Sequence, residues 1–253
     1  MRCFFVKIGD LVTRIKYNND IVFKIIGIEN GVAKLKGQTI RLKADAFLSD
    51  LLVYKEKINE ETEVLDLIRN SKLINGCVLH LDGDEYYLKK CMEVYKKYDI
   101  PAVGYFMDES EMPKRITNLL IDHSPDVLVV TGHDHYKKDN GKESFENSKY
   151  FINTVKKARV YQPSKDALVI FAGACQSYYE ALIESGANFA SSPNRKNINV
   201  LDPVYIAISV ARSHVNWFMD IEETLKKTVS KGVGLGGIDT RGVARKLYQQ
   251  DKS

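Results

Sequence analysis

The chain has 253 residues and carries 37 basic and 33 acidic side chains, for a formal net charge of +4. The two kinds of charge nearly balance, and the basic residues are scattered as single lysines and Lys-Lys pairs. The chain therefore lacks the strongly basic composition that is typical of nucleic-acid-binding domains. No apolar run reaches the roughly 18 residues that a membrane-spanning helix needs, and the first residues lack the apolar stretch of a signal peptide, so we expect a soluble, intracellular protein.

Residues 1–54 are predicted to form a small β domain. Short strands are expected at residues 5–6, 11–15, 21–28, 32–35 and 39–42, and turn-forming pairs such as Asn30-Gly31 separate them. Five short strands at this spacing predict an SH3-like β-barrel. Some barrels of this kind bind peptides or nucleic acids and others are packed accessory domains, and the sequence leaves this choice open.

Residues 55–75 are predicted to be a charged helical linker, because a run of charged side chains leads into apolar residues at helical spacing. Residues 76–253 then alternate between apolar strands and amphipathic helices. Strands are expected to begin near residues 77, 102, 127, 168 and 187, and the last helices at residues 202 and 221. This order predicts an α/β domain in which helices cover both faces of a parallel sheet.

Two of the predicted strands end in residues that can carry chemistry. Val127-Leu-Val-Val-Thr-Gly-His-Asp134 delivers His133, and Leu168-Val-Ile-Phe-Ala-Gly-Ala-Cys-Gln-Ser177 delivers Cys175. The carboxyl ends of parallel strands open onto one crevice, where such folds bind their ligands. A helix predicted from Gln176 would place the thiol near a helix N-terminus, whose partial positive charge favours the thiolate. The pattern predicts a cysteine nucleophile with a histidine base; the alternative is that Cys175 is a small core residue.

The other histidines were weighed against His133. His135 is the competing candidate for the base, because it lies two residues further along the chain. We assign structural roles to His80 inside an apolar strand, to His123 at a helix C-terminus and to His214 in a polar turn.

Asp82-Gly83-Asp84 follows the first strand of the second domain. An Asp-x-Asp after a strand also opens haloacid-dehalogenase-type phosphatases, in which the first Asp is the nucleophile. Those enzymes need a later acidic pair on a strand, and no convincing pair of this kind is present. Asp84 can alternatively be the N-cap of the helix that is predicted to begin at Glu85.

Two further patterns point away from cofactors. The glycine-dense segment 232–242 follows no predicted strand, so it does not match a nucleotide-binding fingerprint, and we predict a close-approach loop that lines the crevice. Four cysteines show neither CxxC spacing nor histidines at ligand intervals, which predicts a reduced protein without a metal site: Cys3, Cys77, Cys91 and Cys175.

With these residues assembled, the chain resembles the YabG family of sporulation-specific peptidases of spore-forming Firmicutes. The matching stretches run almost from end to end and include Ile8-Gly-Asp-Leu-Val12, Val78-Leu-His-Leu-Asp-Gly-Asp-Glu85, Thr131-Gly-His-Asp134, Phe171-Ala-Gly-Ala-Cys-Gln-Ser177, Gly186-Ala-Asn-Phe-Ala-Ser-Ser-Pro193 and Gly234-Leu-Gly-Gly-Ile238. A looser similarity links the chain to caspase-like peptidases, which also place a His and a Cys at successive strand ends. Those enzymes carry Gly after the His, where this chain has Asp134.

The resemblance implies a cysteine endopeptidase with a caspase-like domain that cleaves after Arg. It places Cys175 and His133 at the catalytic positions, with the N–H groups of Cys175 and Asp134 as oxyanion donors. A buried Arg side chain needs a carboxylate partner. In caspase-like enzymes the loop after the first strand helps form the pocket for the residue before the cut, and this similarity points to Asp82 and Asp84. The implied partners are protein substrates of the spore coat and germination machinery, in the cytoplasm of the sporulating cell and on the spore.

Two other functions stay open at this point. One is a phosphatase that uses Asp82, and the other is a coat-assembly module without catalysis. We expect that the protein needs neither a membrane nor a nucleic acid as a partner. The sequence does not indicate an oligomeric state.

Overall fold

The computed structural model describes residues 6–54, 73–139 and 142–247. The chain divides into two compact units, Met1–Val64 and Leu65–Ser253. Most of the predicted linker, residues 55–72, lies outside the described residues, so the predicted domain limits stay a prediction. In the described part of the chain, no helix is long and apolar enough to cross a membrane.

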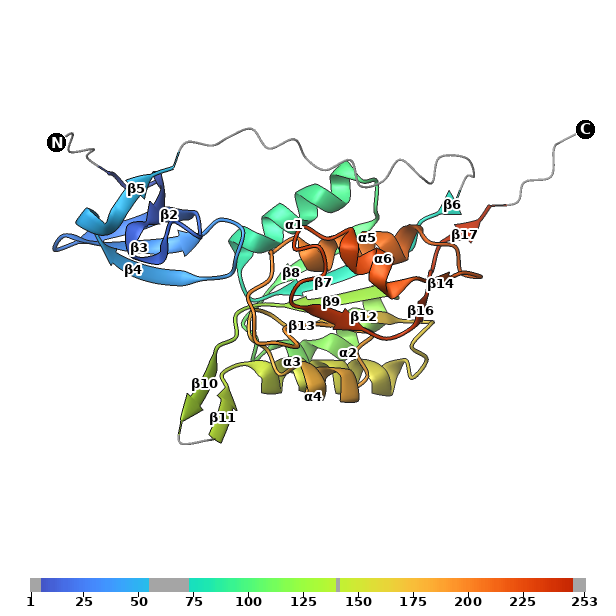
Figure 1. Cartoon of the computed structure of the whole chain (residues 1–253). Coiled ribbons are helices and arrows are strands. Elements are labelled where there is room, and N and C mark those ends of the chain that lie inside the picture. Colours follow the sequence, from blue (N-terminus) through green and yellow to red (C-terminus); the bar gives the residue numbers. More distant parts are fainter. Residues whose placement is uncertain (1–5, 55–72, 140–141, 248–253) are drawn as a thin grey trace, which may run out of the picture. The chain divides into compact units, whose positions relative to one another are not determined.

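The first unit is one antiparallel sheet with the strand order β4-β3-β2-β1-β5 (Figure 1). Its strands and its two short 3-10 helices are β1 (Leu11–Arg14), η1 (Ile15–Tyr17), β2 (Phe23–Glu29), β3 (Val32–Gly37), β4 (Lys43–Phe47), η2 (Leu48–Asp50) and β5 (Leu51–Val53). Side chains that alternate along the strands, among them Val12, Phe23 and Ile25, form its small core.

This sheet corrects two predictions. Within the described residues, its edge strands β4 and β5 do not pair with each other, so the sheet is not the closed barrel that was predicted. The three residues of β5 pair with β1 instead. The strand predicted at residues 39–42 is a turn, because the N–H of Gly37 donates to the Leu42 carbonyl and the chain reverses there.

The second unit is built on a six-stranded sheet with the order β15-β13-β12-β9-β7-β8. Neighbouring strands are parallel, except that β15 runs antiparallel to β13. The strands are β7 (Val78–Asp82), β8 (Ala102–Phe106), β9 (Val127–Thr131), β12 (Val169–Ala172), β13 (Phe189–Ser191) and β15 (Leu235–Gly237). The predicted mixed α/β class with a parallel sheet is confirmed.

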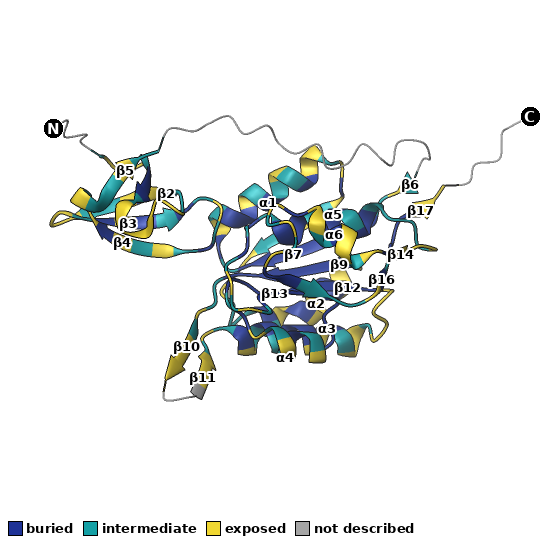
Figure 2. Ribbon diagram, viewed as in Figure 1, coloured by how far each residue is buried: buried dark blue, intermediate teal, exposed yellow. Residues whose placement is uncertain are grey.

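Helices cover both faces of this sheet (Figure 1). One face carries α1 (Glu85–Lys97), α5 (Asp202–Arg212) and α6 (Ile221–Lys226), and the other carries α2 (Met112–His123), α3 (Ser148–Tyr161) and α4 (Tyr179–Glu184). Successive residues of β9 enter opposite cores, with Val127 and Val129 on the α5 side and Leu128 and Val130 on the α3 side. The central strands are therefore buried on both faces (Figure 2), as their continuous apolar runs predict.

Short elements complete the unit. They are the hairpin of β10 (Tyr136–Asp139) and β11 (Lys142–Phe145), the pair β14 (Phe218–Met219) and β16 (Thr240–Arg241), and the pair β6 (Leu73–Ile74) and β17 (Arg245–Lys246). The glycine-dense segment is not the predicted loop, because its residues 235–237 form the edge strand β15. The predicted close approach is confirmed, since a Cβ at Gly236 would lie 2.4 Å from the Tyr179 hydroxyl.

Replacing Arg159 by methionine is expected to lower the free energy of unfolding by about 3 kcal/mol, because several buried carbonyls would lose their donor. The guanidinium donates to the carbonyls of Gly186 and Leu168, each at 2.8 Å, and to Asn188 Oδ1 at 2.7 Å. Burial lowers the pKa of Arg159 to about 10, so the side chain stays charged at neutral pH. Urea denaturation measures the effect. The exposed Lys156→Met on the same helix is the control, and an equal loss for both variants would contradict the prediction.

Candidate active site

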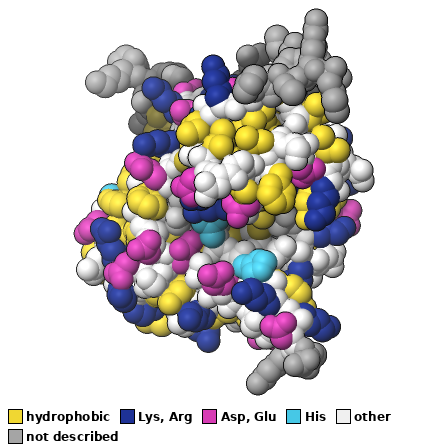
Figure 3. Space-filling view, turned by 90° about the vertical axis from the view of Figure 1, so that its left-hand side faces the viewer, with side chains coloured by type: hydrophobic (Ala, Val, Ile, Leu, Met, Phe, Trp, Pro, Cys, Tyr) yellow, Lys and Arg dark blue, Asp and Glu magenta, His cyan; other side chains and the backbone are white. Residues whose placement is uncertain are grey.

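The two predicted catalytic residues follow neighbouring strands. β9 ends at Thr131, two residues before His133, and β12 ends at Ala172, three residues before Cys175. The two strands are parallel and pair with each other, with Val130 opposite Ala172. His133 and Cys175 are therefore delivered to the same edge of the sheet. Figure 3 views the molecule from the side on which the β10–β11 hairpin lies, where histidine side chains are surrounded by acidic and basic ones.

His133 is held through both its ring and its backbone. Its Nε2 lies 3.0 Å from Asp84 Oδ2, and its ring meets the edge of Tyr87. Its backbone N–H donates to Glu109 Oε1 over 2.7 Å. The ring is partly exposed, and within the described residues its Nδ1 makes no hydrogen bond. Nδ1 is therefore the ring nitrogen that stays available for proton exchange, while Nε2 faces Asp84.

Cys175 lies in a tight turn between β12 and α4. The residue is only 4% exposed, and its Sγ lies 3.9 Å from the carbonyl oxygen of Ile198. Gly173 and Gln176, with φ of 112° and 64°, bend the backbone on either side of it. The helix predicted from Gln176 begins only at Tyr179, because the left-handed conformation of Gln176 interrupts it. The thiol is thus positioned by a turn rather than by a helix N-terminus.

Asp134 joins the two segments that carry His133 and Cys175. Its Oδ2 accepts from Ser177 Oγ at 2.9 Å and from Ser148 Oγ, and its Oδ1 accepts from the N–H groups of His135 and Asn147. Ser177 Oγ in turn accepts from the N–H of Ala174 on the other side of Cys175. The residue after His133 is therefore bonded to the turn that carries the thiol, over a separation of 43 residues.

A buried polar network lies beneath this edge, between β7, β9 and α1. His80 Nδ1 is 3.2 Å from the Tyr95 hydroxyl, and Nε2 is 2.9 Å from Thr131 Oγ1. Thr131 Oγ1 donates to Asp82 Oδ2 at 3.0 Å, and Asp82 Oδ1 accepts from the N–H of Asp84 at 2.8 Å. Burial raises the pKa of Tyr95 well above its ordinary value, so its hydroxyl is protonated and can donate to His80 Nδ1. The network thereby fixes the backbone of Asp84 and the end of β9.

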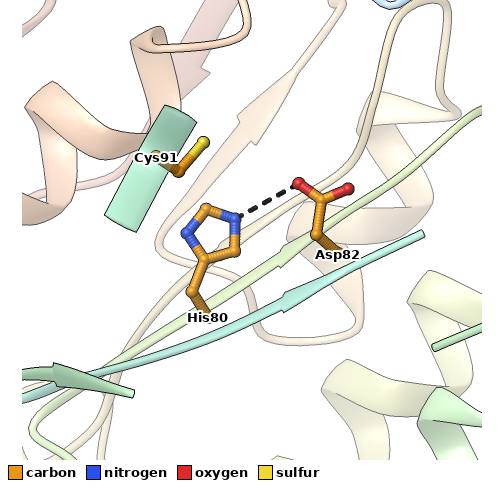
Figure 4. A group of neighbouring side chains, drawn as sticks. All are labelled: His80, Asp82 and Cys91. Carbon is orange, nitrogen blue, oxygen red and sulfur yellow. Dashed lines mark ion pairs between the residues drawn. The ribbon is translucent and has the colours of Figure 1, made fainter. Parts of the chain in front are cut away.

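His80, Asp82 and Cys91 also form the one group in the described part of the chain whose side chains could together hold a metal ion (Figure 4). Their ligand atoms lie within 4.8 Å of one another and are buried. Figure 4 shows the ring of His80 pointing toward Asp82, with Cys91 entering from α1. The set supplies three ligands where a structural zinc site has four, and hydrogen bonds within the protein already satisfy the histidine and the carboxylate. We interpret it as part of the hydrogen-bonded network.

Comparison with known proteins decides the family. The family model of the YabG peptidases, U57, matches residues 7–75 and 68–249. The chain belongs to the YabG peptidase family. It is 43% identical, over 279 aligned positions, to the sporulation-specific protease YabG of Bacillus subtilis (strain 168), and the alignment covers 94% of this chain and 96% of that protein. No solved structure matches the chain.

The two acidic residues that the similarity to caspase-like enzymes assigns to an Arg pocket have different surroundings. Asp82 is fully buried within the polar network. Asp84 caps α1, where its Oδ1 accepts from the N–H groups of Tyr86 and Tyr87, and its Oδ2 faces His133. The capping role predicted for Asp84 is confirmed, and the pocket stays a prediction. The burial of Asp82 argues against a phosphatase, because a nucleophilic carboxylate must reach its substrate.

Sequence reasoning missed Glu109, which follows β8 at the same edge of the sheet. Its carboxylate fits between two glycines: a Cβ at Gly83 would lie 2.1 Å from Oε1, and one at Gly132 would lie 2.5 Å from it. Glycine at both positions is therefore needed to let Glu109 reach the backbone of His133. The signal was present in the acidic run Asp108-Glu109-Ser110-Glu111 directly after a predicted strand.

Proposed function

We propose that the chain is a cysteine endopeptidase in which Cys175 is the nucleophile and His133 is the base. The observation that carries the proposal is the link from Asp134 to Ser177, because it holds the ends of β9 and β12 together. His133 Nδ1 accepts the thiol proton, and the thiolate attacks the scissile carbonyl carbon. The imidazolium then protonates the leaving amine, and a water molecule activated by the neutral ring hydrolyses the acyl-enzyme.

The developing oxyanion is proposed to be held by the backbone N–H groups of Cys175 and Asp134. In the described part of the chain, the N–H of Asp134 donates no hydrogen bond, so it can take up this role. We further propose a caspase-like architecture for the second unit and an SH3-like one for the first. The strand order with a final antiparallel strand supports the former, and the five-stranded order with a 3-10 helix before β5 supports the latter.

The proposed substrates are spore coat and germination proteins, cut after Arg in the cytoplasm of the sporulating cell. Membership of the YabG peptidase family and a relative that is named a sporulation-specific protease support this choice. The test is to incubate the purified chain with extracted coat proteins and to identify the new N-termini by mass spectrometry. New termini that follow Arg are expected, and products without an Arg preference would contradict the specificity.

Asp84→Asn is expected to lower kcat/KM on the order of 10²-fold for every peptide, because the neutral amide holds His133 more weakly and stabilises its charged form less. Asn is itself a good N-cap, so α1 should remain stable. Fluorogenic peptides with Arg and with Gln before the cut distinguish the two roles of Asp84. A loss confined to the Arg peptide would show that Asp84 instead binds the substrate side chain.

A further inference from the structure

Arg195 is bound in an aromatic site that is made by other segments of the second unit. Its Cζ lies 5.9, 5.2 and 5.7 Å from the ring centroids of Tyr136, Phe145 and Tyr178, and its Nη2 lies 2.9 Å from Glu180 Oε2. Phe145 and Tyr178 are stacked on each other, 4.7 Å apart. We refer to Tyr136, Phe145, Tyr178 and Glu180 as the guanidinium cage.

Two residues of the guanidinium cage belong to the segments that carry the candidate catalytic residues. Tyr136 is three residues after His133 and is bonded through its N–H to Gln176 Oε1, and Tyr178 is three residues after Cys175. Arg195 comes from the segment after β13. Its side chain contacts residues of the segments that follow β9 and β12, the two strands that deliver His133 and the thiol.

The same segment lies against the proposed nucleophile. Three residues beyond Arg195, the carbonyl oxygen of Ile198 lies 3.9 Å from Cys175 Sγ, and Cys175 is 4% exposed. Arg195 itself adopts a left-handed conformation, with φ of 53°, which costs an L-residue energy that its contacts must offset. A peptide cannot reach the thiol until this segment moves, and the bond between Arg195 and the cage opposes that movement.

The chemistry of the cage suits any guanidinium. The rings of Tyr136, Phe145 and Tyr178 surround the delocalised cation at 5.2 to 5.9 Å, and a carboxylate accepts a charge-assisted hydrogen bond from it. Neither of the acids predicted to bind a substrate Arg is as accessible, since Asp82 is buried and Asp84 faces His133. Glu180 is about half exposed and can accept a ligand from solvent.

We propose that the guanidinium cage is the subsite for an arginine side chain of the peptide substrate, and that Arg195 occupies it in the free protein as a latch. A substrate arginine then competes with Arg195, and its entry frees the segment that covers Cys175. This proposal rests on the proposed cysteine endopeptidase function. It adds the place where arginine is recognised and the event that opens the site.

The test uses agmatine, a small guanidinium compound, and calorimetry on Cys175→Ala protein, so that no catalysis is involved. Arg195→Gln in this background should bind agmatine at least tenfold more tightly than the parent, and a further Glu180→Gln should remove the gain. Arg241→Gln is the matched control. Arg241 likewise lies over an aromatic ring, that of Phe218, and pairs with a carboxylate, that of Asp166. No gain from Arg195→Gln in folded protein, or an equal gain from Arg241→Gln, would overturn the proposal.

A second measurement follows the latch through the thiol. Iodoacetamide should alkylate Cys175 at least tenfold faster in Arg195→Gln than in wild type, with mass spectrometry to locate the label. If Arg195→Gln does not fold, Arg195→Lys replaces it in both experiments and should show smaller changes in the same direction, because the ammonium keeps its charge but loses the planar contact. Unchanged alkylation in the folded variant would identify Arg195 as an anchor of the hairpin only. Both readouts remain valid if peptide hydrolysis proves to use another nucleophile, so the two proposals can fail separately.

Discussion

Replacing Cys175 by alanine is expected to abolish peptide hydrolysis, with a loss on the order of 10⁶-fold, because the proposed acyl-enzyme forms on the Cys175 thiolate and alanine supplies no nucleophile. The fold should be unaffected. The turn around Cys175 is held by Gly173, by Ser177 and by the carboxylate of Asp134, and none of these contacts uses the sulfur. The measurement is the cleavage rate of purified protein, with thermal unfolding as the check on folding.

Two controls make this result specific. Cys91→Ala removes another buried thiol of the same unit and should leave the cleavage rate within a few-fold of wild type. A metal chelator should also have little effect, since we interpret the His80, Asp82 and Cys91 group as a hydrogen-bonded network. Cleavage at the normal rate by Cys175→Ala, or a complete loss on chelation, would rule out the mechanism.

His133→Ala is expected to lower kcat/KM by about 10²- to 10⁴-fold, because both the thiol deprotonation and the protonation of the leaving amine lose their catalyst. His135→Ala should stay close to wild type. The backbone of His135 donates to Asp134, and its side chain is exposed and makes no hydrogen bond within the described residues. The two variants are matched in size and lie two residues apart, so a general disturbance of this loop would affect both.

The outcome also has a signature in the pH dependence of alkylation. If His133 accepts the thiol proton, the rate at which iodoacetamide modifies Cys175 should show a different pH profile in His133→Ala and an unchanged one in His135→Ala. The reverse ranking of the two variants, in cleavage or in alkylation, would identify His135 as the base.

Much of the second unit is predictable because its strands are continuous apolar runs. The β-branched residues of 127–131 and 169–172 read as buried parallel strands, and the parallel arrangement then places His133 and Cys175 at one edge. The N-cap role of Asp84 is likewise local, since it depends only on the N–H groups two and three residues further on. Both features depend on chemistry that lies close together along the chain.

Contacts between distant segments were not predictable. Three hydrogen bonds join residues that are 24 to 49 positions apart. They run from Ser177 to Asp134, from Thr131 to Asp82 and from the backbone N–H of His133 to Glu109. No periodicity in the sequence encodes such pairs. The β10–β11 hairpin was missed for another reason: its strands are rich in charged residues, mainly Lys, although the Asn140-Gly141 pair between them is a typical hairpin signal.

The start of α4 shows how a local rule can be overridden. Residues 176–185 have a helical pattern, but the helix begins at Tyr179 because Gln176 is left-handed and Ser177 is engaged by Asp134 and Ala174. The tertiary contacts that build the turn around the thiol therefore outweigh the helix propensity of three residues.

The assignment of Cys175 as the nucleophile is tested most directly by a covalent substrate mimic. The wild-type protein is incubated with a peptide acyloxymethyl ketone that carries Arg next to the reactive carbonyl, and the modified residue is located by mass spectrometry. We predict a single adduct on Cys175, formed in proportion to the loss of activity and much more slowly in His133→Ala. An adduct on Cys77 or Cys91, or full activity in protein that is fully modified at Cys175, would contradict the assignment.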